Sequence, residues 1–258
     1  MRVSDQLNRA LAFEKTPQRI ISLVPSQTEL LVALGLKSKL VGITKFCVHP
    51  AALRKEITVV GGTKSLKYDK IRALKPDIII CNKEENTKEI VAECSEIATV
   101  WVSDICSLED SLEMIFLLGE LFKVSEVAAT ICANIVSEKR VFLEFIKDKP
   151  VEKVAYLIWK KPYMAVASNT FVNTMLQLNN FENIFSEENS RYPEIELATL
   201  KLADVVFLSS EPYPFKDSDV QELKKALQTE VLLVDGEYFS WYGSRLQSAF
   251  SYFKSLHH

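Results

Sequence analysis

Residues 19–36, RIISLVPSQTELLVALGL, constrain the fold of this chain more than any other stretch. Residues 20–24 form a short apolar run rich in β-branched side chains, and Pro25 and Ser26 end it. Ser26 is followed three residues later by Glu29, which is the pattern of a capping box at the start of a helix. Gly35 supplies a left-handed stop for that helix. The stretch therefore predicts a strand, a turn and a helix of an α/β domain.

The same order of strands and helices recurs in both halves of the chain. In the first half, further strands are expected at residues 40–44, 78–81 and 100–104, and helices at 68–74, 89–95 and 104–121. In the second half, strands are expected at residues 154–159, 205–208 and 231–234, with helices at 171–178 and at the C-terminus. Strands that are apolar along their whole length and alternate with helices predict parallel sheets covered on both faces.

A single long helix is expected between the two halves. Apolar residues such as Val127, Ile131 and Ile135 recur at helical spacing, and no helix breaker occurs before Pro150. Such a helix is about 35 Å long. The predicted organisation is an N-terminal α/β lobe at residues 1–122, a linking helix at 123–150 and a C-terminal α/β lobe at 151–258. This is an α/β fold of two Rossmann-like lobes with central parallel sheets.

Charge and hydropathy exclude two classes of partner. The chain has 31 basic and 34 acidic residues, and no basic stripe is evident that would follow a phosphate backbone, so nucleic acid is not expected. The longest apolar run, residues 114–118, is far shorter than the roughly 20 residues of a membrane span. Residues 1–9 lack the apolar core of a secretory signal. A cytoplasmic protein is expected, or a periplasmic one if a leader has been removed.

The cysteines favour the cytoplasm of these two locations. Cys47, Cys81, Cys94, Cys106 and Cys132 are odd in number and form no CxxC pair, so neither a disulfide framework nor a zinc site is predicted. Three of them, at positions 81, 94 and 132, follow apolar or helical patterns and are expected to be buried thiols. Free thiols suit a reducing compartment.

The candidate site consists of the loops that follow the strands. In open α/β sheets, ligands bind beyond the carboxyl ends of the strands. These loops combine aromatic residues with basic and acidic ones, which suits a bulky, flat and partly apolar ligand. Trp159 fits either the core or the site, and His49 fits either a structural role or a ligand contact. The candidate ligand-binding residues are Ser26, Phe46, His49, Lys64, Trp159, Tyr163, Arg191, Tyr192, Glu211, Trp241 and Arg245.

Their expected roles follow from their chemistry. The aromatic side chains of the set would pack against the faces of the ligand. Lys64, Arg191 and Arg245 would meet its carboxylate or amide edges, and arginine gives the more directional contact. No GxSxG or HExxH motif is present, and the turn Gly61-Gly62-Thr63-Lys64-Ser65 matches no phosphate-loop spacing. The sequence thus predicts a binding protein without catalytic residues, metal ligands or an intrinsic cofactor.

Three motifs carry a resemblance to a known family. They are residues 19–36, the LVGI of residues 40–43 with His49-Pro50, and Gly61-Gly62 followed by IRALKPDII at residues 71–79. The chain resembles the class III periplasmic binding proteins of cobalamin, haem and ferric-siderophore ABC importers, from about residue 3 to the C-terminus. The resemblance implies two Rossmann-like lobes, a long linking helix and a ligand held between the lobes.

The resemblance also implies roles for individual residues. It places ring-packing aromatics at Phe46, Tyr163, Tyr192 and within residues 235–241, while Lys64 stands where the cobalamin binder has a tryptophan. Docking to the importer uses one surface carboxylate in each lobe. Asp69 matches in the first lobe, and residues 198–199, Ala and Thr, stand where an acid is expected in the second.

Three hypotheses of function follow. The first is a solute-binding protein of the ABC-importer type that clamps a corrinoid or metal-chelate ligand. The second is a haem or ferric-siderophore binding protein that uses His49. The third is a cytosolic cofactor-salvage enzyme on the same scaffold. A small-molecule ligand and a monomeric state are expected in the first two, with importer membrane subunits as the further partner.

Overall fold

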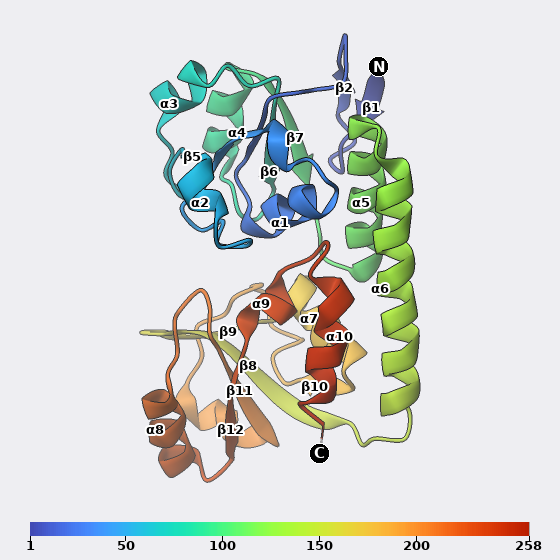
Figure 1. Ribbon diagram of the computed structural model, residues 1–258. Helices are drawn as coiled ribbons and strands as arrows, with labels where there is room; N and C mark the ends of the chain where they lie inside the picture. The colour runs from blue at the N-terminus through green and yellow to red at the C-terminus, as the bar shows by residue number, and fades with distance from the viewer. Residues whose placement is uncertain (258) are drawn as a thin grey trace. The chain divides into compact units, whose positions relative to one another are not determined.

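The computed structural model describes residues 1–257 and divides into two compact units (Figure 1). Unit 1 contains residues 1–105, 109–137 and 242–247, and unit 2 contains residues 106–108, 138–241 and the residues from 248 onward. Helix α6, Ser125–Ile146, contributes residues to both units. The division therefore differs from the predicted boundaries, because the chain returns to unit 1 at residues 242–247 after most of unit 2 has been built.

Unit 1 is built on a five-stranded sheet whose neighbouring strands are all parallel. In spatial order its strands are β5 (Thr58–Val59), β4 (Leu40–Ile43), β3 (Ile20–Ser22), β6 (Ile78–Asn82) and β7 (Thr99–Ser103). The helices of this part are α1 (Pro25–Ala33), η1 (Lys37–Lys39), α2 (Leu53–Glu56), α3 (Tyr68–Ala73), α4 (Lys88–Ser95) and α5 (Leu108–Phe122). All five residues of β6 are buried, as expected for a central parallel strand.

Helix α1 begins without the predicted capping box. Its N-cap is Val24, which makes no side-chain hydrogen bond, and Pro25 occupies the first turn. Proline suits this position because it has no N–H to satisfy and its φ is already helical. Ser26 is buried, and the Glu29 carboxylate forms an ion pair with Arg245 instead of closing back on the helix start. The predicted left-handed stop is confirmed, since Gly35 has a φ of +79°.

An N-terminal hairpin, which the sequence analysis missed, is fastened to the edge of this sheet. Strands β1 (Arg2–Ser4) and β2 (Ala10–Ala12) pair antiparallel. The buried carboxylate of Asp5 accepts a hydrogen bond from the Val102 backbone N–H of β7 at 3.1 Å. Arg9 Nη2 donates to the Val100 carbonyl at 2.9 Å. Strand β7 is the last strand of the sheet, so these contacts occupy polar groups at an otherwise open edge.

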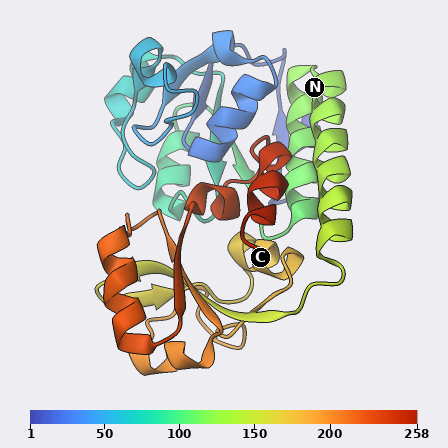
Figure 2. The same cartoon turned by 60° about the horizontal axis from the view of Figure 1, so that its bottom comes forward.

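Helices α5 and α6 lie side by side in both views (Figures 1 and 2). Gly119 permits this approach, because a Cβ atom there would lie 2.5 Å from the Ala128 side chain. Helix α6 extends over 22 residues, which confirms the long helix predicted from the spacing of Val127, Ile131 and Ile135. It ends at Ile146, four residues before the predicted boundary at residue 150.

Unit 2 contains the second parallel sheet. Its order is β10 (Phe181–Asn183), β8 (Glu152–Lys160), β11 (Val205–Ser209) and β12 (Glu230–Val234), and β9 (Tyr163–Ala165) pairs antiparallel with β8. Around it are α7 (Phe171–Leu178), η2 (Leu197–Leu202), α8 (Asp217–Leu227) and α9 (Gly236–Ser240), and α10 (Leu246–Lys254) follows. Strands β9 and β10 and helix α8 were not predicted. In α8 the buried residues Val220, Leu223 and Leu227 have helical spacing, but the charged residues between them conceal it.

The predicted fold class is confirmed, because each unit has a central parallel sheet associated with helices. The core of unit 2 includes Ala155, Leu157, Val206 and Leu208, none of which is exposed to solvent. Within residues 1–257, no helix is both long and apolar enough to cross a bilayer.

Candidate ligand-binding site

In unit 1, four of the five candidate residues follow the carboxyl ends of β3, β4 and β5, and Phe46 among them carries an exposed aromatic ring. The Phe46 side chain is 48% exposed, and Lys45 Nζ lies 4.9 Å from the centre of its ring. A Cβ atom at Gly62 would lie 3.2 Å from the Phe46 ring, so the glycine allows the ring to lie against the turn after β5. An apolar ring of this size exposed at a strand end is available to pack against a ligand.

The other candidates of unit 1 differ in accessibility. Ser26 is buried at the start of α1, and His49 is partly buried three residues after Phe46. Lys64 Nζ is exposed and donates to the Glu84 carbonyl at 2.6 Å. Arg245 forms a bidentate pair with Glu29, with its Nε and Nη2 atoms 3.0 and 2.9 Å from the carboxylate oxygens. The Arg245 guanidinium therefore already has an anionic partner within its own unit.

A buried polar cluster at the same sheet edge was missed by the sequence analysis. Gln27 Nε2 donates to the hydroxyls of Ser103 and Tyr242, and Asn82 Nδ2 donates to Ser103 Oγ at 2.9 Å. Asn82 and Ser103 are the last residues of β6 and β7. Their position at strand ends was the signal that could have identified them. Burial strongly raises the pKa of the Tyr242 hydroxyl, which therefore stays protonated at neutral pH.

In unit 2, Trp159 and Tyr163 occupy the hairpin of β8 and β9. Trp159 is 40% exposed, and its indole N–H donates to the Lys161 carbonyl at 3.1 Å. The ring of Tyr213 lies edge-on to it, with centroids 5.6 Å apart. Tyr163 is partly buried against the core, and this burial raises the pKa of its hydroxyl. The structure therefore places Trp159 outside the core, which was one of the two alternatives left open by the sequence.

Glu211 and Trp241 are brought together at the carboxyl ends of β11 and β12. Glu211 Oε1 accepts hydrogen bonds from Ser240 Oγ at 2.6 Å and from the Trp241 indole N–H at 2.9 Å. Trp241 is only 6% exposed, so in this structure its ring belongs to the core. Burial raises the pKa of the Glu211 carboxyl, and Glu237 and Asp235 add to that effect, whereas the two hydrogen bonds oppose it.

The raised pKa of Glu211 predicts a pH-dependent contribution to stability. The folded protein favours the protonated carboxyl more than the unfolded chain does. The contribution of Glu211 is therefore greatest below the ordinary glutamate pKa and is lost as the pH rises through the folded-state value. Glu211→Gln retains an acceptor oxygen without the charge. We expect the difference in free energy of unfolding, wild type minus variant, to decrease between about pH 4 and pH 7.

Urea unfolding at a series of pH values, followed by tryptophan fluorescence, measures this difference. Glu182→Gln, which alters an exposed residue of β10, is the matched control. If the difference for Glu211→Gln changes no more with pH than the difference for the control, the raised pKa of the Glu211 carboxyl is contradicted.

The remaining predicted residues are two ligand-binding candidates, Arg191 and Tyr192, and the docking carboxylate Asp69. Arg191 Nη2 lies 3.6 Å from the Cys106 sulfur within unit 2, and Tyr192 is partly buried beside it in sequence. Asp69 is fully exposed on α3, with one carboxylate oxygen 3.6 Å from Arg72 Nη1. Neither unit by itself brings all the predicted residues together, because Ser26, Phe46, His49, Lys64 and Arg245 belong to unit 1 and the remaining six ligand-binding candidates to unit 2.

None of the five cysteines, all within the described chain, is in a disulfide. Burial raises the pKa of Cys94 and of Cys132 to about 11, and it also raises the pKa of Cys47 and Cys81. The predicted buried thiols at positions 81, 94 and 132 are confirmed. Among residues 1–257, no cluster of three or more histidine, cysteine or acidic side chains is arranged to hold a metal ion.

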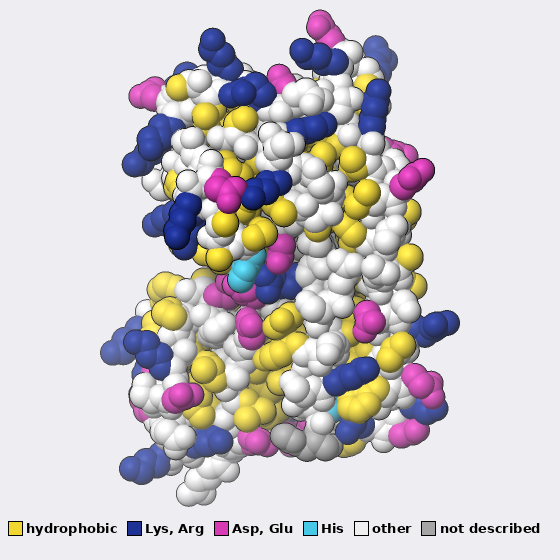
Figure 3. Space-filling view, viewed as in Figure 1, with side chains coloured by type: hydrophobic (Ala, Val, Ile, Leu, Met, Phe, Trp, Pro, Cys, Tyr) yellow, Lys and Arg dark blue, Asp and Glu magenta, His cyan; other side chains and the backbone are white. Residues whose placement is uncertain are grey.

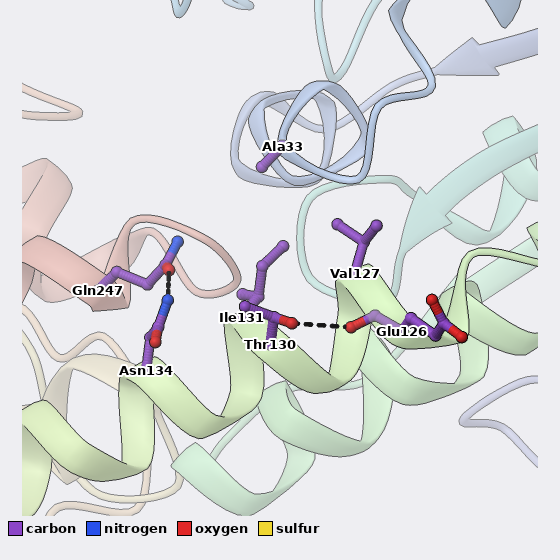
Figure 4. A pocket seen from close by; sticks show the side chains of 7 residues that line it. All are labelled: Ala33, Glu126, Val127, Thr130, Ile131, Asn134 and Gln247. Carbon is purple, nitrogen blue, oxygen red and sulfur yellow. Dashed lines mark hydrogen bonds between the residues drawn. The ribbon is translucent and has the colours of Figure 1, made fainter.

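Unit 1 also has an open groove that contains none of the predicted site residues (Figure 4). Its volume is about 510 Å³. Val127 and Ile131 of α6 and Ala33 of α1 form its apolar wall, and Asn134 donates to Gln247 at one end at 3.0 Å. The groove lies along helices and not at strand ends, so it is separate from the candidate ligand site.

The fold and the strand-end aromatics together define a class of protein: a two-unit α/β ligand-binding protein. Comparison with family models identifies the family within this class, because residues 20–230 match the model described as periplasmic binding protein. The chain belongs to this family. The membership confirms the predicted resemblance and the prediction of a substrate-binding protein of the transport type, and it rules out the enzymatic alternative.

Two curated relatives illustrate the family at the level of sequence. A vitamin B12-binding protein of Vibrio campbellii is 29% identical over 199 residues, which cover 74% of this chain and 70% of the relative. An uncharacterized ABC transporter substrate-binding lipoprotein of Bacillus subtilis is 26% identical over 208 residues, which cover 78% of this chain and 66% of that protein. The match to the second relative thus spans slightly less than two thirds of its length.

Solved structures agree in fold. A periplasmic heme binding protein from Pseudomonas aeruginosa has a TM-score of 0.82 and 23% identity, with 93% of this chain and 92% of that chain covered. The periplasmic vitamin B12 binding protein of Vibrio cholerae has a TM-score of 0.79 and 22% identity, with 93% of this chain and 98% of that chain covered. At these identities the likeness establishes the fold alone.

Proposed function

We propose that this protein binds a corrinoid or a related metal chelate and delivers it to an ABC importer. Membership in the periplasmic binding protein family supports transport of a small ligand. The relatives named as vitamin B12-binding proteins favour a corrinoid among such ligands. The observation that carries the proposal is the exposure of Phe46 and Trp159 at strand ends, where large rings are available to a flat ligand.

Roles for the remaining candidates follow from the structure of each unit. Tyr163 and Tyr192 are partly buried and would add contacts to the ligand with their exposed edges. Lys64 is exposed and would meet an acidic or amide group of the ligand. Arg245 and Trp241 are already held by Glu29 and Glu211, so we propose that they shape the site more than they bind the ligand.

Removal of the exposed aromatic rings tests the proposal. We expect Phe46→Ala and Trp159→Ala each to weaken cyanocobalamin binding about tenfold, because each substitution removes an aromatic contact worth about 1.5 kcal/mol. Phe116→Ala is a closely matched control, because Phe116 has the same 48% exposure as Phe46 but lies on α5. Isothermal titration of the three variants measures the effect.

Two results would contradict the proposal. One is an equal loss of affinity in the Phe116 control. The other is wild-type binding weaker than about 1 mM for cyanocobalamin, hemin and ferrioxamine B alike.

A haem ligand is the second candidate. It is favoured by the position of His49, three residues after the exposed Phe46 in the same loop. An imidazole there would coordinate the iron as an axial ligand. We expect hemin to give a shifted Soret band that His49→Ala abolishes if haem is the ligand. Tight cyanocobalamin binding without a hemin shift would favour the corrinoid.

We propose importer membrane subunits as the partner, with Asp69 as one docking carboxylate. Asp69 is fully exposed, as a docking residue must be, and Arg72 is its ion-pair partner on α3. Substitution of Asp69 by lysine is expected to reduce ligand uptake by the importer reconstituted in vesicles, without a change in ligand affinity. Unchanged uptake would contradict the docking role.

We propose a reducing compartment as the alternative to delivery at an importer, because an importer takes its ligand from outside the cytoplasm. Five thiols without a disulfide, four of them buried, favour this location. Fractionation of the source cells, with immunodetection of the protein in the cytoplasmic and periplasmic fractions, tests the proposal. Recovery in the periplasmic fraction would contradict it.

A further inference from the structure

One segment of unit 1 has a charge very different from that of the whole chain. Residues 37–75 contain ten lysine and arginine residues but only two acidic ones, Glu56 and Asp69, which gives the segment a net charge of +8. The whole chain carries −3. The overall balance of charge, from which a basic surface was judged absent, therefore concealed a strong local excess.

The structure displays these charges on a surface. All ten basic side chains are exposed or partly exposed, and they come from η1, α2, α3 and the neighbouring loops. Figure 3 shows dark-blue side chains spread over the part of the molecule that carries α2 and α3, with few magenta ones between them. Glu56 pairs with Lys37 at 2.7 Å and Asp69 with Arg72 at 3.6 Å. We refer to the exposed surface of residues 37–75 as the basic face.

The composition of the basic face narrows the class of partner. Eight of its ten cations are lysines, and lysine is depleted in the cores of protein–protein interfaces. Nucleic-acid surfaces use arginine for base edges and several aromatic rings for stacking. Among the described residues of the segment, Phe46 is the only large hydrophobic side chain that is more than a third exposed. Many lysines with few arginines and few exposed aromatic rings suit a partner surface that presents many anionic groups in no fixed arrangement.

We propose that the basic face binds the surface of a bilayer rich in anionic lipids. The contact is peripheral and electrostatic: lysine ammonium groups of α2, α3 and their flanking loops lie against lipid phosphates. Each lysine close to such a surface raises the partition coefficient about fivefold. The lysines of α2 and α3 that carry the proposal, such as Lys55 and Lys70, are not among the candidate ligand-binding residues, so the proposal holds whether or not the ligand is a corrinoid.

Co-sedimentation with lipid vesicles tests the proposal. The test variant combines Lys55→Glu, Lys67→Glu and Lys70→Glu. The control combines Lys201→Glu, Lys224→Glu and Lys225→Glu, which make the same change of charge on exposed lysines of unit 2. Thermal unfolding of both variants verifies that they are folded.

We expect the wild type and the control to bind vesicles of equimolar phosphatidylglycerol and phosphatidylcholine at low ionic strength. Binding should be absent with phosphatidylcholine alone and should weaken as salt is added. The test variant should have a partition coefficient lower by about a hundredfold.

Three results would overturn the proposal. The first is no binding of the wild type to the anionic vesicles at low salt. The second is an equal loss in the test and control variants. The third is tighter binding of the wild type to duplex DNA than to the vesicles, which would make the basic face a nucleic-acid surface.

Discussion

Replacement of Asp5 by alanine is expected to lower the free energy of unfolding by about 4 kcal/mol. The Asp5 carboxylate is buried and accepts hydrogen bonds from the backbone N–H groups of Leu7, Arg9 and Val102 at 3.0 to 3.1 Å. It also accepts from Arg9 Nε at 2.8 Å. Alanine would leave these donors without an acceptor and would release the N-terminal hairpin from β7. Urea unfolding measures the loss.

Glu14→Ala is the control for this substitution, because Glu14 is an exposed acid that follows the same hairpin. It should change the free energy of unfolding by less than about 0.5 kcal/mol. Hydrogen exchange adds a local measurement: the amide of Val102 should lose protection in Asp5→Ala. If Asp5→Ala is no less stable than the control, the carboxylate does not anchor the hairpin.

Replacement of Arg245 by alanine is expected to lower the free energy of unfolding by about 3 kcal/mol. Arg245 and Glu29 form a bidentate ion pair within unit 1, and their side chains are only 10% and 22% exposed. Removal of the guanidinium leaves a poorly hydrated carboxylate on α1. The pair also fastens the returning segment 242–247, where Gly243 N–H donates to Ser111 Oγ at 3.0 Å.

A double-mutant cycle separates the ion pair from the packing of Arg245. Arg245→Ala leaves the Glu29 carboxylate without its ion-pair partner, and Glu29→Gln removes that charge. The double variant should therefore be more stable, by about 1 to 2 kcal/mol, than the sum of the two single effects predicts. Additive effects would show that the pair makes no net contribution to stability.

Much of the fold could be predicted because it depends on local patterns. Strands β3, β6 and β11 are apolar runs bounded by turns, and their type was evident from the residues alone. Helix α6 was evident from its periodicity. The N-terminal hairpin was not, because its strands are three residues long and depend on Asp5 reaching β7, nearly a hundred residues away.

The candidate site was predictable as a set of loops but not as a set of accessible side chains. Phe46, Trp159 and Trp241 look alike in sequence, since each is an aromatic residue at or after a strand end. The structure exposes the first two and buries Trp241, whose indole N–H is satisfied by Glu211 from a different strand end. Burial depends on such neighbours, and a single sequence does not show them.

The sequence by itself determined the α/β class, the alternation of strands and helices, the long helix and the buried thiols. These features follow from apolar periodicity and from short-range turn chemistry. Tertiary structure decided that Glu29 pairs with Arg245 across 216 residues, and that ten cations of one segment form an exposed basic face. Ion pairs and surfaces depend on distance in space, which the chain sets only when its sheets and helices have packed.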